Sequence, residues 1–165
     1  MGMEVVGLAP TGEQGRLFVN NVYWWRPLAE FLQSEFPDLT AGCADWDTNA
    51  GAGLDGGAAI LLGEAVGRAV ASGRVAAYEA QRAERLSALP RPECDLCEGR
   101  GYRTDKLGVF YGLDKPRDPV TGKGGCNKCE GTGTVEPLER EYGFDTQNVA
   151  DFGAFLRASG GFRIE

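Results

Sequence analysis

Histidine is absent from the 165 residues of this chain. Because histidine is the side chain that most often transfers protons near neutral pH, its absence excludes Ser-His-Asp and Cys-His hydrolases and any histidine-ligated metal. Long apolar runs are missing as well, since no stretch approaches the roughly 18 residues of a membrane span. The start, MGMEVVGLAP, lacks the basic and then apolar layout of a secretory signal. We therefore expect a cytoplasmic protein that makes no membrane contact.

Basic residues are also scarce, with 17 Lys and Arg against 24 Asp and Glu, which gives a net charge of -7. Binding to a phosphate backbone depends on clustered Lys and Arg that release counterions, so this balance disfavours a nucleic-acid partner. The length is that of a single domain, which buries roughly 70% of the surface of its unfolded chain. The 25 glycines and 8 prolines indicate a globular chain that is rich in loops.

Short runs of β-forming residues at both ends of the chain predict a small sheet. Residues 3–9 and 15–20 flank the turn-prone PTGEQ and predict a hairpin, and residues 161–165 predict a last strand. Between them the hydrophobic period changes to that of helices. The first expected helix covers residues 24–36, with Pro27 in its first turn and Pro37 as its stop. Two more are expected at residues 57–72, capped by Asp55, and at residues 75–88, where Arg82 interrupts the apolar stripe. The last expected helix is capped by Asp145 or Thr146 and ends at Gly160.

The segment 91–137 holds four of the five cysteines, and its glycines and short β-prone pieces, such as GVFYG at residues 108–112, leave little to form a core. The predicted fold class is therefore α+β, with helices packed on a small antiparallel sheet and a zinc-stapled β-hairpin as an insertion. Residues 1–90 and 138–165 form the expected α+β core. The expected zinc-binding hairpin subdomain, with four cysteine ligands, covers residues 91–137.

One eight-residue pattern occurs twice, as CDLCEGRG at residues 94–101 and as CNKCEGTG at residues 126–133. A C-x-x-C turn presents two thiolates, and two such turns supply the four ligands of a tetrahedral Zn²⁺. The glycines after each second cysteine permit the positive φ that the chain needs to fold back and direct backbone N–H groups toward the sulfurs. The pattern predicts one structural Zn²⁺ per chain in a pseudo-twofold clamp. Its predicted ligands are Cys94, Cys97, Cys126 and Cys129.

Two other uses of the cysteines are a pair of disulfides and a thioredoxin-like dithiol. A cytoplasmic chain disfavours structural disulfides, and a redox C-x-x-C is normally a single motif at a strand-to-helix junction. Zinc is the favoured interpretation. Because protein ligands would fill all four positions, no position is left for water or substrate, and we expect the metal to hold structure without performing catalysis.

Both copies match C-x-x-C-x-G-x-G, the repeat that the cysteine-rich domain of DnaJ-type co-chaperones carries, and in this respect the segment resembles that family. The family has four repeats and two zincs, whereas two repeats here leave room for one. A J domain is excluded because its His-Pro-Asp tripeptide needs a histidine. The resemblance covers about 40 residues and implies a zinc hairpin of that shape. The flanking segments NNVYWWRPLAEFL and NVADFGAFLRASGGF also resemble pieces of uncharacterised small proteins of bacteria and their phages.

A second candidate site combines tryptophans with polar residues of the glycine-rich loop before residue 57. Adjacent tryptophans at a helix start cannot both point the same way, so one of the first two is expected in the core and the other nearer the surface. An exposed tryptophan among these residues would line a small-ligand pocket or anchor a partner. The alternative is that they are core aromatics beside a capped loop. The residues are Trp24, Trp25, Arg26, Trp46, Asp47, Asn49 and Asp55.

Residues 112–125 form the one locally basic stretch, with Lys115, Arg117 and Lys123. It fits an acidic partner or a phosphate, or else a solvated loop between the two cysteine turns. Taken together, the sequence favours a non-enzymatic zinc-binding protein that acts by binding another protein, for example as an accessory factor carried by a phage or mobile element. A thiol redox or chaperone-like protein and a nucleic-acid-binding zinc protein are the alternatives.

Overall fold

The computed structural model describes residues 2–165, and the chain divides into two units. The larger, which we call the body, comprises Met1–Arg85 and Glu141–Glu165. The smaller, which we call the cysteine unit, comprises Leu86–Arg140. Each has its own buried hydrophobic cluster. Across the described residues, no helix is long and apolar enough to cross a membrane.

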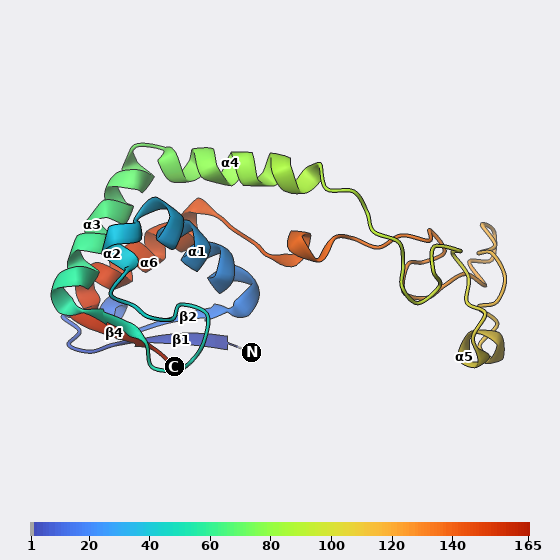
Figure 1. Ribbon diagram of the computed structural model, residues 1–165, viewed down its shortest axis with the longest axis horizontal. Coiled ribbons are helices and arrows are strands. Elements are labelled where there is room, and N and C mark those ends of the chain that lie inside the picture. Colours follow the sequence, from blue (N-terminus) through green and yellow to red (C-terminus); the bar gives the residue numbers. More distant parts are fainter. Residues whose placement is uncertain (1) are drawn as a thin grey trace. The chain divides into compact units, whose positions relative to one another are not determined.

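The body contains one four-stranded antiparallel sheet in the order β2-β1-β4-β3, in which strands from both ends of the chain are joined by one from residues 53–55 (Figure 1). Its strands are β1 (Gly2–Gly7), β2 (Leu17–Asn21), β3 (Gly53–Asp55) and β4 (Gly161–Ile164). The 3-10 turn η1 (Glu13–Gly15) precedes β2. The predicted hairpin and last strand are confirmed. The edge strand β3 lies where a loop was expected. It has only three residues, and its Gly53 approaches Phe162 so closely that a Cβ on Gly53 would lie 1.7 Å from the carbonyl oxygen of Phe162.

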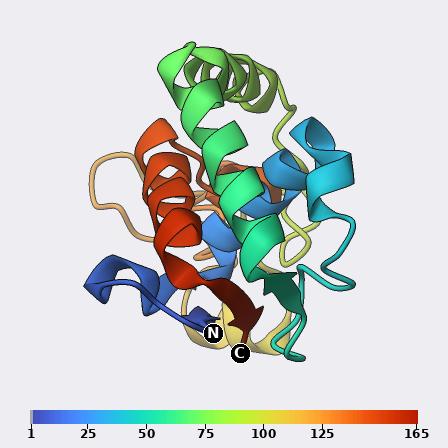
Figure 2. The same cartoon turned by 90° about the vertical axis from the view of Figure 1, so that its left-hand side faces the viewer.

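Helices cover one face of this sheet, and α3 (Gly56–Ala71) and α6 (Thr146–Ser159) run side by side (Figure 2). Their close approach depends on glycine, since a Cβ on Gly63 would lie 3.0 Å from the carbonyl oxygen of Gly153. The predicted caps are confirmed: the carboxylates of Asp55 and Asp145 accept the N–H groups of the first turns. The sequence therefore specifies both the start of each helix and the face that it buries.

Helix α1 (Val22–Glu35) begins earlier than expected, because the side chain of Asn21 caps it. Pro27 consequently lies inside the helix and not in its first turn. The expected stop at Pro37 is confirmed, since α1 ends at Glu35 with Phe36 as its C-cap. Pro37 then begins the separate short helix α2 (Pro37–Thr40), which was not expected.

Helix α4 (Arg74–Ser87) carries the polar residue expected to interrupt its apolar stripe, yet Arg82 is buried. Its guanidinium donates to the backbone carbonyl of Tyr142 at 3.0 Å, which satisfies a charge that burial would otherwise destabilise. This contact lies within the body and ties residues on either side of the inserted segment.

The cysteine unit contains one helix, α5 (Lys106–Phe110), and the 3-10 turn η2 (Leu138–Glu141) spans its end. In the described segment Leu86–Arg140 the β structure consists of a single isolated bridge between Glu93 and Thr134. The expected β-hairpin is therefore not confirmed. The GVFYG piece, predicted to be β-prone, lies in and just after α5, because the side chain of Asp105 caps a helical turn there.

Candidate metal centre

Each cysteine repeat folds into the same tight turn. In the first, the N–H of Gly99 donates to the carbonyl of Cys94 at 3.3 Å and that of Arg100 donates to the carbonyl of Cys97 at 3.1 Å. The second repeat reproduces both bonds 32 residues later, at 3.1 and 3.0 Å. Gly99 has a φ of 76° and its counterpart Gly131 a φ of 86°, as the glycine pattern predicted.

The two turns clasp one another reciprocally. The N–H of Cys94 donates to the carbonyl of Gly133 at 2.8 Å, and the N–H of Cys126 donates to the carbonyl of Gly101 at 2.7 Å. A Cβ on Gly133 would lie 2.3 Å from the carbonyl oxygen of Gly99, so a side chain cannot occupy this position without moving the backbone. These paired contacts relate the two repeats by an approximate twofold axis.

This clasp brings the four cysteine sulfurs together, all within 4.8 Å of one another. The distance is 3.8 Å between the Sγ atoms of Cys94 and Cys126, and 3.7 Å between those of Cys97 and Cys129. A tetrahedron with Zn–S bonds of about 2.3 Å has an S–S edge of about 3.8 Å. All four thiols are free and buried, so the arrangement fits an enclosed metal and not a pair of disulfides.

Burial, backbone N–H groups and the neighbouring cysteines shift the pKa values of Cys97 and Cys129 in opposite directions. Burial raises the pKa of Cys97 to about 11, although the N–H of Gly101 opposes the change. Burial also raises the pKa of Cys129, but the N–H groups of Gly133 and Gly131, together with the Cys97 and Cys126 side chains, lower this pKa to about 7. The N–H of Gly133 lies 3.2 Å from the Cys129 sulfur. Such donors stabilise thiolate, the form that binds metal.

Two cations accompany the second turn, and sequence reasoning did not identify either contact. Lys128, between the two cysteines of that turn, forms an ion pair with Asp95 of the first turn. The hydrogen bond to Asp95 raises the pKa of Lys128, and the nearby cysteines Cys94 and Cys126 add to the effect. Arg103 donates to the side-chain oxygen of Asn127 at 3.0 Å. The lysine inside the C-x-x-C sequence was the available signal for the first contact.

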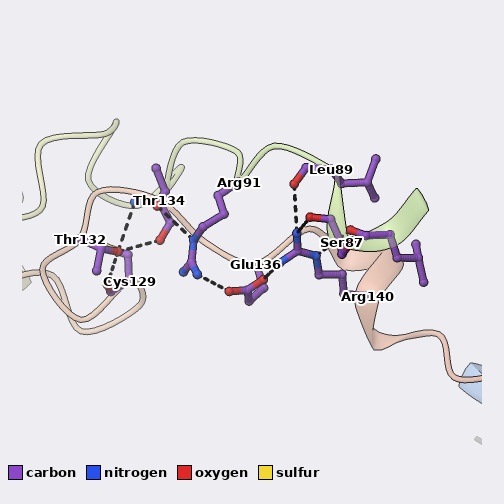
Figure 3. A network of polar contacts seen from close by, with 9 residues as sticks. Ser87, Leu89, Arg91, Cys129, Thr132, Thr134, Glu136 and Arg140 are labelled. Atoms are coloured by element: carbon purple, nitrogen blue, oxygen red, sulfur yellow. Dashed lines mark hydrogen bonds and ion pairs between the residues drawn. The ribbon is translucent and has the colours of Figure 1, made fainter. Parts of the chain in front are cut away.

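A polar network continues from the second turn to the ends of the cysteine unit (Figure 3). The hydroxyl of Thr132 lies within hydrogen-bond distance of the carbonyls of Cys129 and Thr134, at 2.7 and 2.9 Å. Arg91 contacts the hydroxyl of Thr134 and pairs with Glu136, which also pairs with Arg140. The Arg140 guanidinium donates to the carbonyls of Leu86, Ser87 and Leu89 at 2.9 to 3.1 Å. Arg140 thus holds the two ends of the unit together.

The tryptophan set does not form one site. Trp25 and Trp46 are buried in the core, where the indole N–H of Trp25 donates to the carbonyl of Trp46 at 2.6 Å and the rings stack at 6.1 Å. Trp24 is half-buried, so the expected division between the adjacent tryptophans is confirmed. These contacts support the interpretation of two of the three as core aromatics.

The remaining members of the set are spread over the body. Trp24 lines a hollow of about 330 Å³ with residues of α6, whereas Arg26 and Asp47 line a different one of about 530 Å³. The side-chain amide of Asn49 donates to the carbonyl of Gly2, and Asp55 caps α3. The structure therefore brings Arg26 and Asp47 together but separates both from Trp24.

Comparisons of the chain with known protein families, with curated proteins and with solved structures give no match. The four-cysteine centre consequently stands on its own geometry.

Proposed function

We propose that the four buried cysteines bind one structural Zn²⁺ and that the protein is a non-enzymatic accessory factor whose zinc-stabilised unit binds another protein. The observation that carries the metal assignment is the convergence of four free thiols at tetrahedral spacing. A set of four soft sulfur ligands selects zinc over hard cations such as Mg²⁺ and Ca²⁺.

The composition of the cysteine unit supports a structural role for the metal. Its buried hydrophobic cluster consists of the four cysteines, with Val135 packed against them. A segment of this size without a larger apolar cluster lacks the burial that normally stabilises a domain. The metal would supply the missing stabilisation, as it does in small zinc domains.

Burial also distinguishes this centre from a thiol redox site. Cys94 and Cys97 are fully buried, and Cys126 and Cys129 expose at most 6% of their surface. A thiol that attacks a disulfide must be accessible to its partner. The repeat similar to that of DnaJ-type co-chaperones supports a zinc-bound turn of the same kind, but its chaperone activity is not part of this proposal.

Native mass spectrometry tests the metal directly. We expect one zinc per chain in the wild-type protein and none in Cys97→Ser, which removes one ligand. Cys43→Ser is the matched control, because Cys43 is also buried but belongs to the core of the body. Retention of zinc by Cys97→Ser, or a wild-type chain with no metal and two disulfides, would refute the proposal.

A further inference from the structure

We propose that an exposed apolar surface on α5 binds an acidic amphipathic helix of a protein partner. We call this surface the α5 patch and define it as Leu107, Val109, Phe110 and Tyr111. The inference rests on the proposed function, since it names the surface and the partner chemistry through which the zinc-stabilised unit would act.

The α5 patch concentrates large apolar side chains in a single turn. The exposed fractions are 60% for Leu107, 55% for Val109, 79% for Phe110 and 67% for Tyr111. The Phe110 and Tyr111 rings contact each other edge to face, with centroids 5.0 Å apart. Single exposed apolar residues are common, but contiguous ones, aromatic residues above all, are typical of interaction sites.

The turn that carries the patch is held firmly on its other side. Asp105 caps α5 through the N–H groups of Leu107 and Gly108, and Arg103 binds both carboxylate oxygens of Asp105. Gly108 is buried against Arg103, where a Cβ would lie 2.4 Å from the Arg103 Cβ. The N–H of Leu113 donates to the carbonyl of Gly108 at 2.8 Å. The apolar side chains are therefore displayed by a pre-organised turn, which lowers the entropic cost of binding.

The charges of the segment that carries the patch favour an acidic partner. Lys106 is the first residue of α5, and Lys115 follows Leu113 by two positions. Residues 106–123 contain four cations and two carboxylates, and none of these cations forms an ion pair within the described residues 2–165. The carboxylate of Asp118 is occupied by backbone N–H groups of its own loop.

The shape and the charge balance favour a helix over the other acidic surfaces. Leu107, Phe110 and Tyr111 stand at positions i, i+3 and i+4, so they form one ridge that packs along the apolar stripe of a partner helix. Acidic residues flanking that stripe would pair with the free lysines. A nucleic acid or an anionic bilayer would require a denser cluster of cations than a segment that also carries two aspartates.

The metal centre is connected to this surface through one side chain. Arg103, which anchors α5, also donates to Asn127, the residue directly after the metal ligand Cys126. Loss of the metal removes the fixed position of Asn127 and hence one anchor of the turn. We therefore expect the α5 patch to bind only in the metal-loaded protein.

The test uses the full chain and two synthetic peptides that share a Leu/Phe face and differ in carrying Glu or Lys on the polar face. Isothermal titration calorimetry should detect binding of the Glu peptide, weakened by added salt, and at most marginal binding of the Lys peptide. The double variant Phe110→Ser/Tyr111→Ser should weaken binding about tenfold or more. Leu138→Ser is the matched control, since Leu138 is a 59% exposed apolar residue of the same unit outside the patch.

The zinc content of every sample is measured alongside, so that two failures can be separated. A metal-loaded wild-type chain that does not bind the Glu peptide, or that binds both peptides equally, would overturn the inference while the zinc assignment stands. Stronger binding to phosphatidylserine vesicles than to the Glu peptide would overturn it in favour of a lipid surface. A wild-type chain without zinc would instead refute the proposed function.

Discussion

Removal of the metal should unfold the cysteine unit and leave the body folded. A structural zinc site contributes about 10–16 kcal/mol of binding free energy near pH 7, whereas a whole domain is stable by about 5–15 kcal/mol. Among the described residues 86–140, the buried apolar cluster consists only of the four cysteines and Val135, so little remains once the metal that joins the four sulfurs is gone. The body keeps its own core, which includes Phe31, Phe152 and Phe162.

The measurement is hydrogen exchange followed by mass spectrometry, with and without a chelator. We expect amides throughout residues 91–137 to lose protection after chelation and those of α3 and α6 to keep it. Cys97→Ser should reproduce this pattern without chelator, and Cys43→Ser should not. Protection of the cysteine unit that survives complete metal removal would refute the reasoning, because it would require a source of stability other than the metal.

Three further substitutions test particular contacts. Gly133→Ala should weaken zinc binding about tenfold or more, because the new Cβ would collide with the carbonyl of Gly99 in the other turn. The control is Gly122→Ala: Gly122 has a similar φ of 68° but open space around it. This control should lower the stability of the unit by only about 1 kcal/mol and leave zinc titrations unchanged. Trp25→Phe should destabilise the body by about 2–4 kcal/mol in urea unfolding, since it leaves a buried carbonyl without its donor, whereas Trp24→Phe should change the unfolding free energy by less than about 1 kcal/mol. Arg140→Met should speed hydrogen exchange in the last turn of α4 and the residues just after it, because the carbonyls of Leu86, Ser87 and Leu89 lose their donor. An unchanged rate would contradict the role of this arginine.

Elements with their own local signal were predictable from the sequence. The hairpin, the Asp55 and Asp145 caps, the stop at Gly160 and the two cysteine turns each depend on residues a few positions apart. Such signals are carried by the chain itself, because caps and tight turns satisfy backbone groups locally. The site followed for the same reason, since each repeat builds half of it.

Elements that depend on distant partners were missed. Strand β3 exists because β4, more than a hundred residues away, pairs with it. The helix at α5 depends on Asp105, whose cap outweighs the β-preference of the apolar residues that follow. The sequence left open which tryptophans lie in the core, because the contact between Trp25 and Trp46 joins residues 21 positions apart.

In each unit an arginine joins the two chain segments that lead to the other unit, and this has an evolutionary consequence. Arg140 joins the segments by which the chain enters and leaves the cysteine unit, and Arg82 joins the corresponding segments of the body at Tyr142. A module whose two ends meet can be gained or lost by one recombination event without disturbing its host. The four-cysteine segment is thus suited to being gained or lost as one piece, and the body to carrying a different module in its place.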